Sequence, residues 1–269
     1  MPYASNQGVN IYYEVEGHGL PLVLAHGMGA GADLNAWRNT GYTDVLKDEF
    51  QLILFDIRGF GKSDKPGKVD IPLSDAADDV ITVLDYLGIE KAHYLGYSMG
   101  ASVGFKQAVN HIDRFYSFIL GGMTPGPWPE EMVRAREISA ELVKLRQSDP
   151  EAYFARMEGL LGHPLTSGEK SELLSRDEET GAAEQPSRSD EIALKEVELA
   201  GIDIPCLLYC GDRDPFYKGA QESVQYMPRA VFVSLDGLDH ISAFFRSDVI
   251  VRLVKQFLTV VNRGLPSES

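Results

Sequence analysis

Short apolar or alternating runs recur along the chain, separated by longer segments whose apolar positions repeat every three or four residues. Most of the runs have the character of strands that are buried on both faces. They cover residues 9–15, 22–25, 51–55, 92–95, 116–120, 205–210 and 230–233. Helical spacing occurs at residues 75–87, 99–110 and 249–261, and Ser74 is expected to cap the first of these helices. This alternation predicts an α/β fold with a mostly parallel, doubly wound sheet.

The strand pattern stops between residues 125 and 199. Helical segments replace it at residues 130–147, 150–161 and 168–174. A charged stretch of small residues, 176–190, follows them and is expected to be mobile. The pattern predicts a core built from residues 1–124 and 200–269, with residues 125–199 inserted as a helical cap over one end of its sheet.

The composition bounds the partners and the compartment. With 269 residues and 44% hydrophobic content, the chain can bury one large core. Its formal net charge of −15 repels nucleic acid and anionic lipid, so neither is an expected partner. The chain starts without the basic and apolar regions of a signal peptide and has no apolar run of about eighteen residues, which predicts a cytoplasmic protein without a membrane partner.

The two cysteines, Cys206 and Cys210, lie four residues apart on an expected strand. The rise of an extended chain separates them by about 13 Å, which is beyond the reach of a disulfide. Both are therefore expected to be buried thiols, as a reducing compartment permits.

A serine stands at the centre of Gly96-Tyr97-Ser98-Met99-Gly100, between an expected strand and an expected helix. Glycines on both sides remove the clashes that a sharp strand-to-helix turn would otherwise cause. Such a turn holds the hydroxyl of Ser98 out at the carboxyl edge of the sheet. Because a serine hydroxyl is a weak nucleophile near neutral pH, a base must lie beside it.

Candidates for that base and its partner follow later strands. His240 comes after the run 230–233, in a loop at the same edge of the sheet. Asp214 and Asp212 both follow the run 205–210, and either could orient the imidazole. A histidine can take the proton of Ser98 and return it to a leaving group, while a carboxylate selects the histidine tautomer.

The loop His26-Gly27-Met28 follows the run 22–25 and is expected to approach Ser98. The backbone N–H groups of Met28 and Met99 are predicted to form an oxyanion hole, while the His26 side chain is expected to be a structural hydrogen bonder. In the turn of residues 56–63, a network of side chains without a catalytic role is expected.

Together these motifs resemble those of the α/β-hydrolase superfamily. They are His26-Gly27, Asp56-x-Arg58-Gly59-x-Gly61-x-Ser63, Gly96-x-Ser98-x-Gly100, Gly211-x-x-Asp214 and Asp239-His240. They stand in family order between about residues 9 and 261. The resemblance implies that Ser98 is the nucleophile, Asp214 rather than Asp212 the acid, and His240 the base. Ser98 replaces the aspartate of haloalkane dehalogenases and epoxide hydrolases, which disfavours both activities.

The resulting expectation is a serine hydrolase that cleaves small or medium carboxylic esters through an acyl-enzyme on Ser98, with no metal ion and no organic cofactor. Trp128 and Phe154 in the cap are candidates to line the substrate pocket. An enol-lactonase and a carbon–carbon bond hydrolase are the alternatives on the same fold. Residues 26–31 resemble the glycine-rich oxyanion loop of the carbon–carbon bond hydrolases. A lyase, or a ligand-binding or signalling protein without catalysis, represents a different class.

Overall fold

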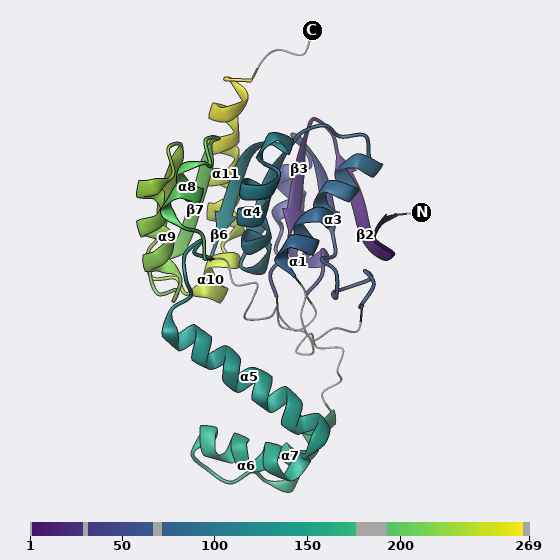
Figure 1. Ribbon diagram of the computed structural model, residues 1–269, viewed down its shortest axis with the longest axis vertical. Helices are drawn as coiled ribbons and strands as arrows, with labels where there is room; N and C mark the ends of the chain where they lie inside the picture. The colour runs from purple at the N-terminus through teal and green to yellow at the C-terminus, as the bar shows by residue number, and fades with distance from the viewer. Residues whose placement is uncertain (1, 29–31, 67–71, 176–192, 266–269) are drawn as a thin grey trace.

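The computed structural model describes residues 2–28, 32–66, 72–175 and 193–265. Within these residues an eight-stranded sheet has the order β1-β2-β4-β3-β5-β6-β7-β8 (Figure 1). The strands are β1 (Tyr3–Asn6), β2 (Val9–Gly17), β3 (Leu20–Ala25), β4 (Phe50–Phe55), β5 (Ala92–Tyr97), β6 (Phe115–Gly121), β7 (Cys206–Gly211) and β8 (Ala230–Leu235). Strands β1 and β2 pair antiparallel, β2 pairs antiparallel with β4, and all pairs from β4 to β8 are parallel. The predicted mostly parallel α/β sheet is confirmed.

Helices cover both faces of this sheet, and three further helices, α5 to α7, extend away from it. The helices of the described residues are α1 (Asn35–Asn39), α2 (Tyr42–Leu46), α3 (Leu73–Tyr86), α4 (Met99–Asn110), α5 (Glu130–Ser148), α6 (Pro150–Leu161), α7 (Ser167–Ser175), α8 (Glu196–Ala200), α9 (Tyr217–Ser223), α10 (His240–Phe244) and α11 (Ser247–Asn262), with the 3₁₀ helices η1 (Ile112–Arg114) and η4 (Val224–Tyr226). Alternate residues of β3 enter two different cores: Val23 belongs to one and Leu24 to the other. The sheet is therefore doubly wound, as the wholly apolar strands predicted.

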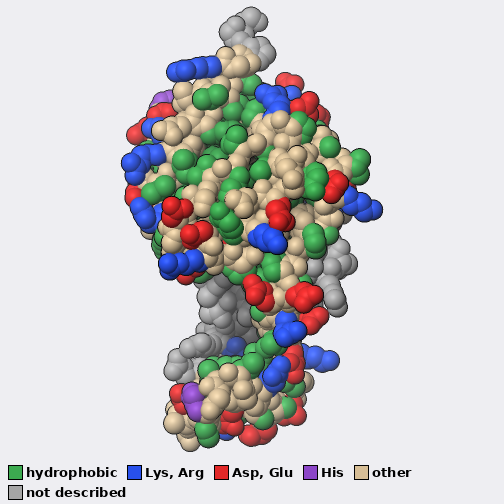
Figure 2. Space-filling model, turned by 90° about the vertical axis from the view of Figure 1, so that its left-hand side faces the viewer, with side chains coloured by type: hydrophobic (Ala, Val, Ile, Leu, Met, Phe, Trp, Pro, Cys, Tyr) green, Lys and Arg blue, Asp and Glu red, His purple; other side chains and the backbone are tan. Residues whose placement is uncertain are grey.

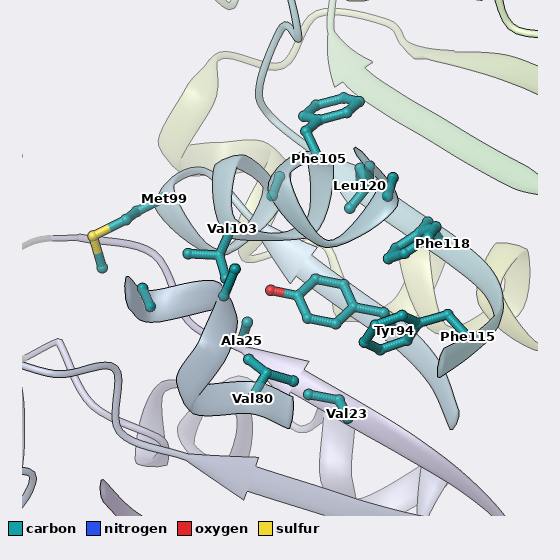
Figure 3. Close-up of a cluster of buried hydrophobic side chains, with 14 of the residues drawn as sticks. Val23, Ala25, Val80, Tyr94, Met99, Val103, Phe105, Phe115, Phe118 and Leu120 are labelled. Carbon is teal, nitrogen blue, oxygen red and sulfur yellow. The ribbon is translucent and has the colours of Figure 1, made fainter. Parts of the chain in front are cut away.

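The first core lies between the sheet and helices α3 and α4. Figure 3 shows Tyr94, Phe115 and Phe118 close together at one end of this cluster, with Met99 at the other. The three aromatic rings have centroids 4.9–5.8 Å apart. This packing seats α4 against β5, so the turn between them is held by the core on either side.

The predicted cap of helix α3 is wrong. The helix begins at Leu73, one residue before Ser74, and Pro72 is its N-cap without a side-chain hydrogen bond. Leu73 is buried in the first core. Burying a leucine side chain contributes about 1.5–3 kcal/mol, whereas a serine cap contributes about 1 kcal/mol. The apolar contact therefore decides where the helix begins.

Helices α5, α6 and α7, here called the arm, lie in the chain between β6 and β7. The observed bounds agree with the predicted helical segments to within one residue at each end. Helix α5 runs away from the body near α10, and α6 and α7 lie at its far end (Figure 1). Figure 2 shows the same arm below the body. The stretch 176–190 lies outside the described residues, and closure of residues 125–199 over Ser98 stays a prediction.

Both cysteines are buried free thiols, as predicted. Burial raises the pKa of Cys206 to about 12. In the described part of the chain, no helix combines the length and the apolar character that crossing a membrane requires.

Candidate active site

Ser98 lies between the end of β5 and the start of α4. Its φ is +54° and its ψ is −116°, in a region that residues with a side chain rarely adopt. The backbone N–H of Ser98 donates to the carbonyl oxygen of Gly121 on the neighbouring strand β6, at 2.8 Å. A non-glycine residue persists in such a conformation only where its surroundings over-determine it, which is typical of functional sites.

The flanking glycines are required by close backbone contacts. A Cβ atom at Gly96 would clash with the backbone of Gly100, and one at Gly100 would clash with the backbone of Ala25 at the end of β3. Two strands and one helix therefore meet around Ser98 at distances that only glycine allows.

The structure brings Ser98, Asp214 and His240 together. His240 Nδ1 is 2.7 Å from Asp214 Oδ2, and His240 Nε2 is 2.9 Å from Ser98 Oγ. Because an ionised carboxylate only accepts, Nδ1 carries the ring proton, and Nε2 of the neutral imidazole accepts from the serine hydroxyl. The Asp214 side chain is fully buried and that of His240 is 25% exposed. The pair is thus placed to draw a proton from Ser98.

Asp214 is further held by its own loop, where its Oδ1 accepts the backbone N–H of Phe216 at 3.0 Å. Asp212 instead is exposed, and its Oδ1 accepts the backbone N–H of Gly237 at 2.8 Å. Of the two carboxylates that the sequence offered, Asp214 is the one that contacts the imidazole of His240.

His26 has the structural role that the sequence predicted. Its ring is buried, and burial lowers its pKa. The backbone N–H of Ile57 donates to Nε2 at 3.1 Å, so the proton is on Nδ1, which donates to the carbonyl oxygen of Gly27 at 2.8 Å. A Cβ atom at Gly27 would lie 3.3 Å from Ser98 Cβ. The His26 ring thus holds the backbone of this loop next to Ser98.

The two candidate oxyanion donors, Met28 and Met99, directly follow Gly27 and Ser98 in the chain. Met28 follows Gly27 and is half-buried against the first core. Met99 is the first residue of α4, where backbone N–H groups have no acceptor within the helix. Residues 29–31, which complete the glycine-rich loop, lie outside the described residues.

The two aromatic residues predicted for the pocket have different places. The ring of Trp128 is 5.3 Å from that of Phe216, which is 5.8 Å from the ring of His240. Phe154 lies on α6, where its ring contacts Tyr153 at 5.7 Å. Helix α6 lies at the far end of α5 from the body (Figure 1). The structure therefore brings Trp128 close to the site and does not bring Phe154 there.

Sequence reasoning missed two residues that contact His240. Phe216 contacts its ring edge-on, and the hydroxyl of Tyr97 donates to its carbonyl oxygen at 2.6 Å. A bulky apolar residue two positions after Asp214, in a charged loop, was the only available signal for Phe216. Nothing in the sequence pairs Tyr97 with a residue 143 positions away.

The turn of residues 56–63 is held by side chains, as predicted. The carboxylate of Asp56 accepts the backbone N–H groups of Leu34 and Lys62, each at 2.7 Å. Arg58 donates two hydrogen bonds of 2.6 Å to the buried carboxylate of Asp79. The side chains of Asp56 and Arg58 are therefore hydrogen-bonded to other groups of the fold.

Comparisons with known proteins identify the family of the chain. The family model described as alpha/beta hydrolase fold matches residues 21–153. The RutD protein of Azorhizobium caulinodans, whose name proposes carbamate hydrolysis, is 30% identical over 231 residues, or 80% of this chain and 81% of that protein. The 3-oxoadipate enol-lactonase 1 of Acinetobacter baylyi is 26% identical over 78% of each chain. The chain therefore belongs to the α/β-hydrolase family.

Solved structures share the fold over nearly the whole chain. An esterase from Thermogutta terrifontis has a TM-score of 0.72 at 23% identity, covering 97% of each chain. The enol-lactonase from Burkholderia xenovorans LB400 has a TM-score of 0.71 at 24% identity, covering 96% of this chain and 100% of its own. These structures show the fold, and the relatives in sequence support hydrolase activity for this chain.

Proposed function

We propose that the chain is a serine hydrolase that cleaves small or medium carboxylic esters through an acyl-enzyme on Ser98. One observation carries the proposal: the hydroxyl of Ser98, the imidazole of His240 and the carboxylate of Asp214 form one continuous line of hydrogen bonds. A hydroxyl, a base and a group that orients the base are the parts that acyl transfer to serine requires.

In the first half-reaction, His240 Nε2 takes the proton of Ser98 as Oγ attacks the ester carbonyl carbon. The imidazolium then gives that proton to the departing alkoxide, so that the alcohol leaves and the acyl group stays on Oγ. In the second half, His240 takes a proton from water, whose oxygen attacks the acyl carbon, and returns it to Ser98 as the carboxylic acid leaves. Asp214 stays ionised and stabilises the imidazolium in both halves.

The negative charge that develops on the carbonyl oxygen needs donors. The N–H groups of Met28 and Met99 are the proposed pair, since the Gly27 backbone lies against Ser98 and Met99 begins α4. Removing one such donor costs about 10²–10³ in kcat in related chemistry.

The substrate site is proposed to include Trp128. Its aromatic contact with Phe216, which itself contacts the ring of His240, supports an apolar wall near the reacting atoms. Phe154 is left out of this wall, because its ring contacts Tyr153 within the arm.

Enol-lactones and carbamates are the second candidate substrates, favoured by the names of the two relatives in sequence. The same serine chemistry serves both classes. Opening a lactone leaves the alcohol tethered to the acyl group, and attack on a carbamate leaves a carbamoyl group on Ser98.

The test is a panel of nitrophenyl esters of increasing acyl length, an enol-lactone and a carbamate, each assayed with the wild type and with Ser98→Ala. The highest kcat/KM is expected for an ester, with loss of turnover in the variant. A preference for the lactone or the carbamate, again lost in Ser98→Ala, would keep the mechanism and change the substrate. Turnover that survives in Ser98→Ala, or no turnover of any compound, would refute the proposal.

A further inference from the structure

Helix α10 carries the base of the proposed site and is only five residues long. So short a helix has little stability of its own, and contacts with the rest of the fold must therefore fix its position. At its start, the Asp239 carboxylate accepts the N–H of Ser242 at 2.8 Å. That bond orders the turn but does not connect it to the strand that bears the nucleophile.

Two tyrosine hydroxyls connect α10 to other elements, one at each end of the helix: Tyr97 from β5 and Tyr42 from α2. Tyr97 donates to the carbonyl oxygen of His240 at 2.6 Å, and Tyr42 donates to the carbonyl oxygen of Phe244 at 3.0 Å. The ring of Phe244 lies between them, with centroids 5.0 Å from Tyr97 and 5.6 Å from Tyr42. The two bonds are alike in chemistry and differ in what stands beside them.

Tyr97 is the residue before Ser98, so it belongs to the strained turn itself. The residue is 3% exposed, and burial raises the pKa of its phenol, which keeps the phenol protonated and able to donate. Its ring is 5.4 Å from the imidazole of His240. Gly122 leaves the space for the phenol, since a Cβ atom there would lie 2.6 Å from Tyr97 Cζ.

We infer that Tyr97 is a positioning residue, whose hydroxyl ties the backbone of His240 to the turn that holds Ser98. The nucleophile and the base are 142 residues apart in the chain. Tyr97 belongs to the segment that carries Ser98, and its hydroxyl is hydrogen-bonded to the backbone of His240. The inference rests on the proposed function, because the distance it controls is the one between Ser98 Oγ and His240 Nε2.

Tyr97→Phe tests it, with Tyr42→Phe as the matched control. Each substitution removes one hydroxyl that donates to a carbonyl of α10 and keeps the ring in its packing. The readouts are kcat, KM and melting temperature, together with the rate at which an organophosphonate labels Ser98. Labelling needs an activated hydroxyl and does not depend on which natural substrate the enzyme takes.

For Tyr97→Phe we expect kcat and the labelling rate to fall together by about ten- to a hundredfold, because small misplacements of reacting groups have costs of this order. KM should stay within about twofold of the wild type. For Tyr42→Phe we expect a change in melting temperature similar to that of Tyr97→Phe, with kcat and the labelling rate near the wild-type values. A structural role would instead make activity follow the melting temperature in both variants.

Three results would overturn the inference. If Tyr97→Phe were labelled at the wild-type rate, the hydroxyl of Tyr97 would not position the base. The proposed function would still stand if Ser98→Ala were inactive. Equal losses of kcat in both tyrosine variants would reduce Tyr97 to support of the fold. Absence of labelling in the wild type would show that Ser98 is not activated, and would remove the proposed function together with the inference.

Discussion

Replacing Asp214 by asparagine removes a charge from the site and also reverses one hydrogen bond. One carboxylate oxygen accepts from His240 Nδ1 at 2.7 Å, and the other accepts from the backbone N–H of Phe216 at 3.0 Å. An asparagine has one acceptor oxygen and one donor NH₂ group, so it can satisfy only one of them. If its oxygen stays with Phe216, its NH₂ group faces Nδ1 and favours the tautomer with the proton on Nε2.

That tautomer cannot accept the proton of Ser98. We therefore expect Asp214→Asn to lower kcat by about 10⁴, the loss associated with a wrong tautomer in a triad. At about 1.36 kcal/mol for each factor of ten, this corresponds to about 5.5 kcal/mol of transition-state stabilisation. Full burial of the Asp214 side chain adds to the effect, since water cannot take over the contact with His240.

Asp212→Asn is the matched control, two residues away in the same loop. Asp212 is exposed, and an amide oxygen can still accept from the backbone N–H of Gly237. We expect kcat within about twofold of the wild type and a small decrease in melting temperature. The assay compares kcat, KM and melting temperature of both variants on the best nitrophenyl ester. A larger loss of kcat in Asp212→Asn would refute the assignment of Asp214.

Three further predictions follow from the same geometry. Ser98→Ala should lower kcat by about 10⁶ without unfolding the protein, and an organophosphonate should label Ser98 alone in the wild type; mass spectrometry that finds another labelled serine would contradict this. Trp128→Ala should change the relative kcat/KM among acyl chain lengths, by about 1–3 kcal/mol for each methylene. Phe154→Ala should change the kcat/KM of all esters by one common factor, because the ring contacts of Phe154 lie within the arm. An effect of Phe154→Ala that depends on acyl length would show that α6 reaches the substrate. Burial lowers the pKa of His93 from 6.5 to about 4, so the unfolded chain binds this proton first and the free energy of unfolding should decrease as the pH falls from about 6.5 to 4. In His93→Gln the melting temperature should change less with pH over this range. The same dependence of melting temperature on pH in wild type and variant would exclude His93 as its source.

Features that depend on neighbouring residues could be predicted from the sequence. The turn at Ser98 is specified within five residues, since the two glycines permit the backbone contacts that the turn makes. Helix α4 has the predicted bounds, and the arm helices deviate by at most one residue at each end. Helical periodicity is a local property, so it can be recognised without knowledge of the fold.

Short elements escaped the same reasoning for a physical reason. Strand β1 has four residues, and helices α1, α2 and α10 have five residues each. None of them completes enough periods of a pattern to be recognised, and tertiary contacts stabilise them. Ser74 shows a related limit: a local capping preference is weaker than the burial of the leucine beside it.

The tertiary structure alone decided which of several equivalent groups meet. Asp212 and Asp214 follow the same strand, and only the path of the loop after β7 turns Asp214 towards His240. Likewise, the contact between Tyr97 and His240 depends on how β5 and α10 pack, which no local pattern encodes. The arm is the third case: its helices follow from periodicity, but no local pattern encodes their direction away from the body (Figure 1).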